Sequence, residues 1–322
     1  MLALALLAVA VAALWLARGG WRRGVVREVG ANAPADGTVR RGAAAAEAPS
    51  GPLTVYCGRP EPLMAPLFDR FGERTRTSLV VRYGETWPLE EELVHDAIAP
   101  PAAVFVAQDA AALGALSRKG LLLELPLEIV QQVEPRFAGT ESKRDWAGLS
   151  ARARAIVYDP ATMPAAQLPQ TLDALAEERF AGRFGFAPSN DSFQAQLATY
   201  RVLAGRDALT GLLRGLKGNR PRLYVDNGAV VQAVARGEIA FGLVNHYSLW
   251  RERGTVAAGR LAIAFMNGGG AGGFVNAAGV GVLANDPRAF DLVRFLLSPD
   301  AQRTFAEKAY EYPLAKGLPP PE

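Results

Sequence analysis

The 322-residue sequence contains one cysteine and two histidines. A single cysteine cannot form an intramolecular disulfide, and three Cys and His residues cannot by themselves complete a tetrahedral zinc site. Lysine is scarce too, because only five of the 35 basic residues are Lys, and the Arg residues are scattered along the chain. The net charge of +3 therefore reflects a preference for Arg, and it does not predict a nucleic-acid-binding stripe.

Catalytic motifs are missing as well. The sequence has no G-K-[ST] phosphate loop, no H-E-x-x-H and no G-x-S-x-G. Gly268, Gly270 and Gly273 have the spacing of a dinucleotide fingerprint, but strand-like residues follow where that fingerprint opens a helix, so we interpret residues 267–273 as a loop. No residue pattern supplies a nucleophile with a base, and we expect a protein that is not an enzyme.

The longest apolar run lies at the N-terminus. Residues 2–16 are all Leu, Ala, Val or Trp, and Arg18, Arg22 and Arg23 follow. A bilayer span needs about 20 apolar residues, so this run suits a signal-peptide core or a short anchor. Residues 28–51 are rich in Ala, Gly and Pro and predict a tether. We expect an extracytoplasmic protein, exported or anchored through residues 2–17, with cleavage and an upstream start both open.

The remaining chain alternates strand-like and helix-like segments. Residues 53–57 are β-like, residues 62–74 place apolar side chains on one helical face, and residues 79–81 return as a strand. Further strand-then-helix pairs are residues 104–106 with 109–116, 184–186 with 190–203, and 239–244 with a short helix, before two proline-entered helices at 287–297 and 299–309. This alternation predicts an α/β fold with mainly parallel sheets covered by helices.

Helix-capping residues stand at several of these strand-to-helix turns. Asp109, Asn190, Asp226 and Asn245 all have N-cap chemistry, and three of them directly follow a strand. Ligands of open α/β sheets bind at the carboxyl ends of strands, where free N–H groups attract anions. The pattern points weakly to a polar ligand, because good capping alone would also produce it.

Seven stretches resemble one known family in order along the chain. They are residues 55–62 (VYCGRPEP), 81–86 (VRYGET), 103–113 (AVFVAQDAAAL), 150–158 (SARARAIVY), 185–194 (GFAPSNDSFQ), 242–248 (GLVNHYS) and 311–314 (EYPL). The chain resembles the periplasmic ferric-iron-binding proteins of ABC importers. The resemblance implies a two-lobed, type II periplasmic-binding-protein fold with a ligand cleft between the lobes. Lobe 1 would contain residues 52–151 and 276–292, lobe 2 residues 152–275 and 293–322, and residues 1–51 would be signal or anchor plus linker.

The same resemblance implies a site for Fe(III) with carbonate or another synergistic anion. Implied metal ligands are Tyr247, Tyr158 and Glu85, and implied contacts to the anion or ligand are Arg59, Gln108, Arg152, Asn190, Asp191, Ser192, Asn227 and Asn245. Three family positions differ: the Tyr-Tyr pair reads Tyr247-Ser248, Pro60 replaces a His of many members, and Gln108 replaces a Glu of some. These changes favour iron with more anion or water in its shell, or a ferric chelate.

The predicted function is an extracytoplasmic solute-binding protein that delivers its ligand to an ABC permease, as a monomer and without nucleic acid. Two alternatives remain open. The same fold would bind a metal-free organic or phosphorus-containing anion through helix N-termini and Arg. A membrane-tethered sensory or partner-binding module is the other, suggested by the anchor-like N-terminus.

Overall fold

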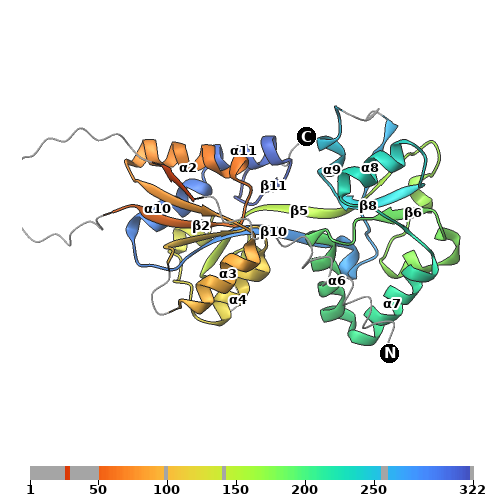
Figure 1. Cartoon of the computed structure of the whole chain (residues 1–322), viewed down its shortest axis with the longest axis horizontal. Coiled ribbons are helices and arrows are strands. Elements are labelled where there is room, and N and C mark those ends of the chain that lie inside the picture. The colour runs from red at the N-terminus through yellow and green to blue at the C-terminus, as the bar shows by residue number, and fades with distance from the viewer. Residues whose placement is uncertain (1–25, 30–50, 98–100, 140–142, 255–259, 320–322) are drawn as a thin grey trace, which may run out of the picture.

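The structure is a computed structural model that describes residues 26–29, 51–97, 101–139, 143–254 and 260–319, and these residues form two α/β lobes. Strands β5 (Trp146–Tyr158) and β10 (Val275–Val282) pair in antiparallel fashion and run from one lobe into the other (Figure 1). The predicted two-lobed α/β fold is therefore confirmed. The apolar run at residues 2–17 lies outside the described residues. None of the helices in the described ranges combines the length and apolar character that a membrane span requires.

Lobe 1 is a sheet with helices on both faces. Its strands run in the order β1-β3-β2-β4-β10-β5, with β2 parallel to both β3 and β4. The strands are β1 (Val26–Val29), β2 (Leu53–Cys57), β3 (Leu79–Tyr83) and β4 (Val104–Ala107). One face is covered by α2 (Glu61–Thr75), α5 (Leu127–Val130), α10 (Pro287–Leu296) and α11 (Pro299–Ala309), and the other by α3 (Thr86–His95) and α4 (Ala110–Arg118). The predicted βαβ unit is β2-α2-β3.

Lobe 2 is built around the second half of β5. The strand order continues β5-β8-β6-β7, and β9 pairs with β5. The strands are β6 (Phe184–Phe186), β7 (Arg222–Leu223), β8 (Phe241–Asn245) and β9 (Ala262–Ala264). Helices α6 (Asp191–Ala204) and α7 (Arg206–Gly218) lie on one side of this sheet, and α8 (Asn227–Ala235) and α9 (Ser248–Arg251) on the other (Figure 1). The predicted glycine-rich loop ends in a short 3-10 turn, η6 (Gly270–Gly273), that leads into β10.

The C-terminal helices belong to lobe 1, so the prediction that residues 293–322 lie in lobe 2 is wrong for their described part. Leu296 and Phe305 are fully buried in the core that also contains Phe68 of α2. The following strand, β11 (Tyr312–Pro313), pairs with the first half of β5. Helices α10 and α11 follow β10 back into lobe 1 and bury their apolar faces against its sheet, which a helical pattern alone does not reveal.

Strand β1 also departs from the prediction, which made all of residues 1–51 signal, anchor or linker. β1 pairs antiparallel with β3 over four residues, from Val26 opposite Arg82 to Val29 opposite Leu79. The Arg27 guanidinium lies 2.8 Å from the Asp69 carboxylate of α2. Without β1, β3 would be the edge strand of the sheet, and the backbone N–H and C=O groups along its outer edge would be unpaired. The short segment β1, which contains β-branched residues, pairs with this edge.

Candidate ligand-binding site between the lobes

The strand ends of lobe 1 meet at one edge of its sheet. The Thr86 hydroxyl accepts a hydrogen bond from the Gln108 backbone N–H at 3.0 Å and lies 3.5 Å from the Gly58 carbonyl oxygen. A Cβ on Gly58 would lie 2.2 Å from that hydroxyl, so no other residue fits there without a shift. Thr86 thus ties together the turns that follow β2, β3 and β4. Glu85 is exposed at the N-cap of α3 without a capping hydrogen bond, and its carboxylate is available to a ligand.

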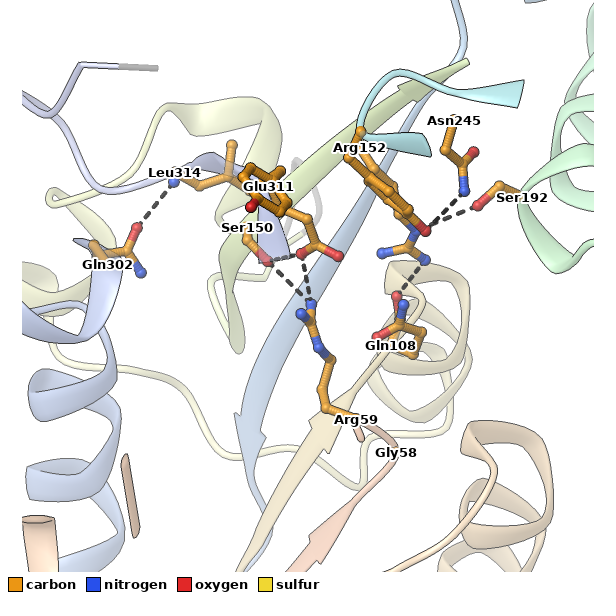
Figure 2. A network of polar contacts seen from close by, with 12 residues as sticks. Gly58, Arg59, Gln108, Ser150, Arg152, Ser192, Asn245, Gln302, Glu311 and Leu314 are labelled. Atoms are coloured by element: carbon orange, nitrogen blue, oxygen red, sulfur yellow. Dashed lines mark hydrogen bonds and ion pairs between the residues drawn. The ribbon is translucent and has the colours of Figure 1, made fainter. Parts of the chain in front are cut away.

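Arg152 of β5 connects the two lobes (Figure 2). Its side chain is buried, and its Nη2 donates to the Gln108 carbonyl at 2.7 Å while its Nε donates to the Ser192 hydroxyl at 3.2 Å. Nη1 has no hydrogen-bond partner among the described residues. Burial lowers the pKa of Arg152, an effect that the nearby Glu311 carboxylate opposes. The predicted residues Gln108, Arg152 and Ser192 are therefore brought together.

A second arginine, which the sequence analysis did not single out, lies two residues further along the same face of β5. Arg154 is buried, and its guanidinium donates to three amide oxygens, those of Asn245 at 3.0 Å, Gln196 at 3.3 Å and Asn190 at 3.4 Å. None of these partners carries a charge, and Nη2 has no partner among the described residues. Burial lowers the pKa of Arg154 to about 9. The available signal was the Arg-x-Arg alternation within an apolar strand, since residues i and i+2 share a face.

Tyr247 lies directly beyond β8, and Asn245 fixes its hydroxyl. The Asn245 Nδ2 donates to the Tyr247 hydroxyl at 3.0 Å, while the Asn245 Oδ1 accepts from Arg154. The Arg251 guanidinium lies 4.1 Å from the Tyr247 ring centroid. The prediction that Asn245 caps a helix is wrong, because α9 begins only at Ser248 and the Asn245 amide is already bound on both sides. Ser248, at the position of the second family tyrosine, is buried, and its hydroxyl has no partner among the described residues.

Arg59 has a charged partner within lobe 1 (Figure 2). Its Nη1 donates to the Glu311 carboxylate at 2.9 Å and to the Ser150 hydroxyl at 3.0 Å, and all three side chains are buried. Burial would raise the pKa of Glu311, but Arg59 and Arg152 more than offset this and lower it. The segment that carries Glu311 is anchored by Gln302, whose Oε1 accepts from the Leu314 backbone at 3.0 Å. The Nε of Arg59 is buried without a partner among the described residues.

His246 joins the end of β8 to the C-terminal segment. Its Nδ1 accepts from the Ala153 backbone N–H at 3.2 Å, and its Nε2 lies 2.9 Å from the Tyr310 carbonyl oxygen. The ring also stacks on Tyr312, with centroids 4.3 Å apart. Burial lowers the pKa of His246 to about 4, so the ring is neutral at pH 7. Because both ring nitrogens already have backbone partners, His246 has no lone pair left for a ligand.

Three predicted residues lie apart from this cluster or at its margin. Tyr158 is four residues beyond Arg154 on β5, about 13 Å along the strand, and its side chain is buried in the lobe 2 core. Asn227 opens α8, on the side of the sheet opposite α6, where Asp226 makes the cap. Asp191 is exposed as the first residue of α6, while Asn190 caps that helix through the Phe193 N–H at 3.2 Å.

Buried polar atoms without partners gather around the cluster. Within the described ranges they include Arg59 Nε, Gln108 Oε1, Arg152 Nη1, Arg154 Nη2 and Ser248 Oγ. Each such atom costs about 1–3 kcal/mol when it is left unpaired, so the arrangement is suited to an incoming polar ligand. Within the same ranges, no three His, Cys, Asp or Glu side chains are grouped closely enough to hold a metal ion.

The chain is similar to proteins of known function over most of its length. The "Fe(3+)-binding periplasmic protein" of Serratia marcescens is 28% identical over 282 residues, which cover 86% of this chain and 82% of that protein. The "Major ferric iron-binding protein" of Neisseria meningitidis serogroup B is 29% identical over 268 residues, which cover 81% of this chain and 80% of that protein.

Solved structures show the same similarity. Iron-bound HitA from Pseudomonas aeruginosa has a TM-score of 0.72 at 29% identity, over 83% of this chain and 87% of that one. Trichodesmium FutA "in complex with iron and citrate ligands" has a TM-score of 0.71 at 28% identity, and the match covers 84% of this chain and 88% of that one. A sequence model of the family described as "Bacterial extracellular solute-binding protein" matches residues 99–322. The chain therefore belongs to the bacterial extracellular solute-binding proteins.

Proposed function

We propose that this protein captures ferric iron, as a chelate or with a synergistic anion, between its lobes and delivers it to an ABC permease. The observation that carries the proposal is the pair Arg152 and Arg154 beside the Tyr247 hydroxyl. Both guanidinium groups are buried, and no carboxylate of the described residues is bound to either. The relatives named for ferric iron support the choice of cargo.

Each part of the cluster suits one part of an anionic ferric cargo. Fe(III) is a hard cation that prefers oxygen ligands, and Tyr247 supplies a phenolate and Glu85 a carboxylate. The free Nη groups of Arg152 and Arg154, with the N-terminus of α6 at Asn190, suit carboxylate or carbonate oxygens. Ser248 has no phenolate to offer, so the cargo itself completes the metal shell. Tyr158 and Arg59 are not part of this proposed set, because one is a core residue and the other is bound to Glu311.

Delivery follows from the difference between open and closed lobes. The Arg152 side chain already joins Gln108 of lobe 1 to Ser192 of lobe 2, and a bound anion adds contacts to both. A ligand that binds the closed arrangement more tightly shifts the population toward it, and the permease recognises that form. The protein would act outside the cytoplasmic membrane, exported or held there through residues 2–17.

A titration of the purified protein with ferric citrate tests the proposal. We expect a saturable visible band from phenolate-to-iron charge transfer, which Tyr247→Phe abolishes and Tyr158→Phe, as the matched control, leaves intact. A band that persists in Tyr247→Phe would remove this tyrosine from the site. Thermal stabilisation by citrate alone, with no band when iron is added, would show that the cargo is a metal-free anion. A ligand at 100 times its Kd stabilises the folded state by about 2.7 kcal/mol.

A further inference from the structure

A hollow of about 290 Å³ lies on lobe 2, outside the cluster described above. Its walls are Leu172 and Asp173, the last turns of α6 at Tyr200 and Leu203, and the glycine loop Gly268–Gly272. The Tyr200 hydroxyl donates a hydrogen bond to Asp173. Gly269 and Gly270 have φ of 85° and 62°, and a Cβ on either would meet nothing within 4 Å, so side chains do not shield the loop. The hollow equals the volume of roughly ten water molecules.

Exposed aliphatic side chains lie on α6, which forms one wall of the hollow, and on α7, which packs against α6. Val202 and Leu203, in the last turn of α6, are 83% and 64% exposed, and Leu213 on the outer face of α7 is 43% exposed. Helix α7 follows α6 after the single residue Gly205, and the two helices pack against each other. Clustered exposed aliphatic residues with a polar border are typical of interaction sites.

The border of the patch is positively charged. Arg201, Arg206, Arg214 and Lys217 are all exposed, and none forms an ion pair within the described residues. Nearby carboxylates include Asp207 on α7, Asp173, which accepts from Tyr200, and Glu177, which is paired with Arg179 at 2.6 Å. By contrast, Arg294 on lobe 1 is paired with both Glu128 and Asp291 at 2.8 Å. Because Asp173 and Glu177 already have partners, the four exposed cations favour an acidic partner.

We propose that this surface, formed by residues 200–217 and 268–272, is a docking site for the permease, and the proposal rests on the function proposed above. The occupant is a protein segment that carries carboxylates beside one bulky apolar side chain. The carboxylates face the four cations, and the apolar side chain enters the hollow against Leu172 and Leu203. A flat bilayer surface would leave that hollow unfilled, which is why the shape favours a protein partner.

Helix α6 connects the docking surface to the ligand. It has 14 residues and spans about 21 Å. Its N-cap Asn190 contacts Arg154, and Ser192 in its first turn contacts Arg152. Its other end carries Val202 and Leu203. Movement of the α6 N-terminus when the lobes close on a ligand therefore reorients the docking surface as part of one rigid helix.

Site-specific photocrosslinking in the native cells tests the docking site. The full chain carries Leu203→p-benzoylphenylalanine, and the matched control is Leu127→p-benzoylphenylalanine, because Leu127 is 53% exposed on α5 of lobe 1. We expect irradiation to join position 203, and not position 127, to a permease subunit identified by mass spectrometry. No permease adduct from 203, an adduct with lipid only, or equal adducts from both positions would overturn the proposal.

Charge reversal separates failed docking from failed binding. We expect Arg206→Glu with Lys217→Glu to lower iron uptake by cells at least tenfold while ferric citrate affinity in vitro stays within twofold. Leu203→Asp should act in the same direction, and Leu127→Asp should not. Normal uptake in both the charge-reversed and the Leu203→Asp chains would refute the docking site. Absence of ferric citrate binding in the wild type would refute the proposed cargo instead, and the crosslink would still report on docking.

Discussion

The buried Arg59 differs from the buried pair Arg152 and Arg154 in the charge of its partners. Arg59 of lobe 1 is bound to the carboxylate of Glu311 at 2.9 Å, whereas the hydrogen-bond partners of Arg152 and Arg154 among the described residues are all neutral oxygens. A buried charge is tolerated when it is paired and hydrogen-bonded. The comparison assigns Arg59 to the architecture of lobe 1, and it assigns Arg152 and Arg154 to an anionic cargo.

The largest expected effect on stability comes from breaking the ion pair between Arg59 and Glu311. Glu311→Gln leaves Arg59 buried without its counter-charge and should lower the free energy of unfolding by about 3–5 kcal/mol. Urea denaturation at pH 7 measures this. The double change Glu311→Met with Arg59→Met removes both charges and should recover most of the loss. Equal stability of Glu311→Gln and the wild type would show that the ion pair does not stabilise lobe 1.

A pH dependence follows from His246, which packs between Ala153 and the Tyr310–Tyr312 segment. Its folded pKa of about 4 lies below its ordinary value of 6.5, so the unfolded chain takes up a proton first as pH falls. Stability should therefore decrease between pH 6.5 and 4, by up to about 3 kcal/mol. Glu311, whose folded pKa is lowered, contributes stability that is lost only below about pH 4.3. Chemical denaturation of wild type and His246→Gln across this range is the measurement, and identical slopes would contradict the assignment.

At Arg154, which has no carboxylate partner among the described residues, a substitution should affect ligand affinity and stability differently. Arg154→Met removes a buried cation that has no counter-charge, which stabilises the fold, but it also leaves the Gln196 and Asn245 amide oxygens unpaired at about 1–3 kcal/mol each. Because these effects oppose each other, the free energy of unfolding should fall by less than the roughly 3–5 kcal/mol expected of Glu311→Gln, about 3 kcal/mol at most. The affinity for ferric citrate should fall about 10- to 150-fold, which corresponds to a charge-assisted hydrogen bond of about 1.5–3 kcal/mol. Calorimetric titration and urea denaturation of the same sample test both statements. A large loss of stability with unchanged affinity would make Arg154 a structural residue.

The smallest effect is expected at a pair that is only half-buried. Arg27 and Asp69 are each 37% exposed, and solvent screens their attraction. Arg27→Ala should lower the free energy of unfolding by about 0–1 kcal/mol. Hydrogen exchange at the β3 amides gives a sharper readout, since faster exchange at Leu79–Arg82 would show that Arg27 secures β1. A loss above 2 kcal/mol would contradict the view that partial exposure weakens the pair.

The sequence predicted the local elements well and the long-range contacts poorly. The strand at Leu53, the helices after Asp109 and Asn190, and their caps depend on neighbouring residues, so pattern and propensity were sufficient. Arg59 and Glu311 are 252 positions apart, and the amide oxygens around Arg154 come from β8 and from α6 with its cap, 36 to 91 positions away. No pattern among neighbouring residues predicts contacts between positions so far apart in the sequence. The prediction that residues 293–322 belong to lobe 2 was wrong for the same reason. The pattern of an amphipathic helix does not specify which sheet the helix covers.

The most direct test of the account compares ferric citrate binding by two double variants. Arg152→Met with Arg154→Met removes the unpaired cations, and Arg59→Met with Glu311→Met removes the paired ones. The account predicts a loss of affinity of at least 100-fold in the first variant and a change of less than about threefold in the second, with both folded. Unchanged affinity in the first variant, or the greater loss in the second, would contradict the assignment of the unpaired arginines to the cargo.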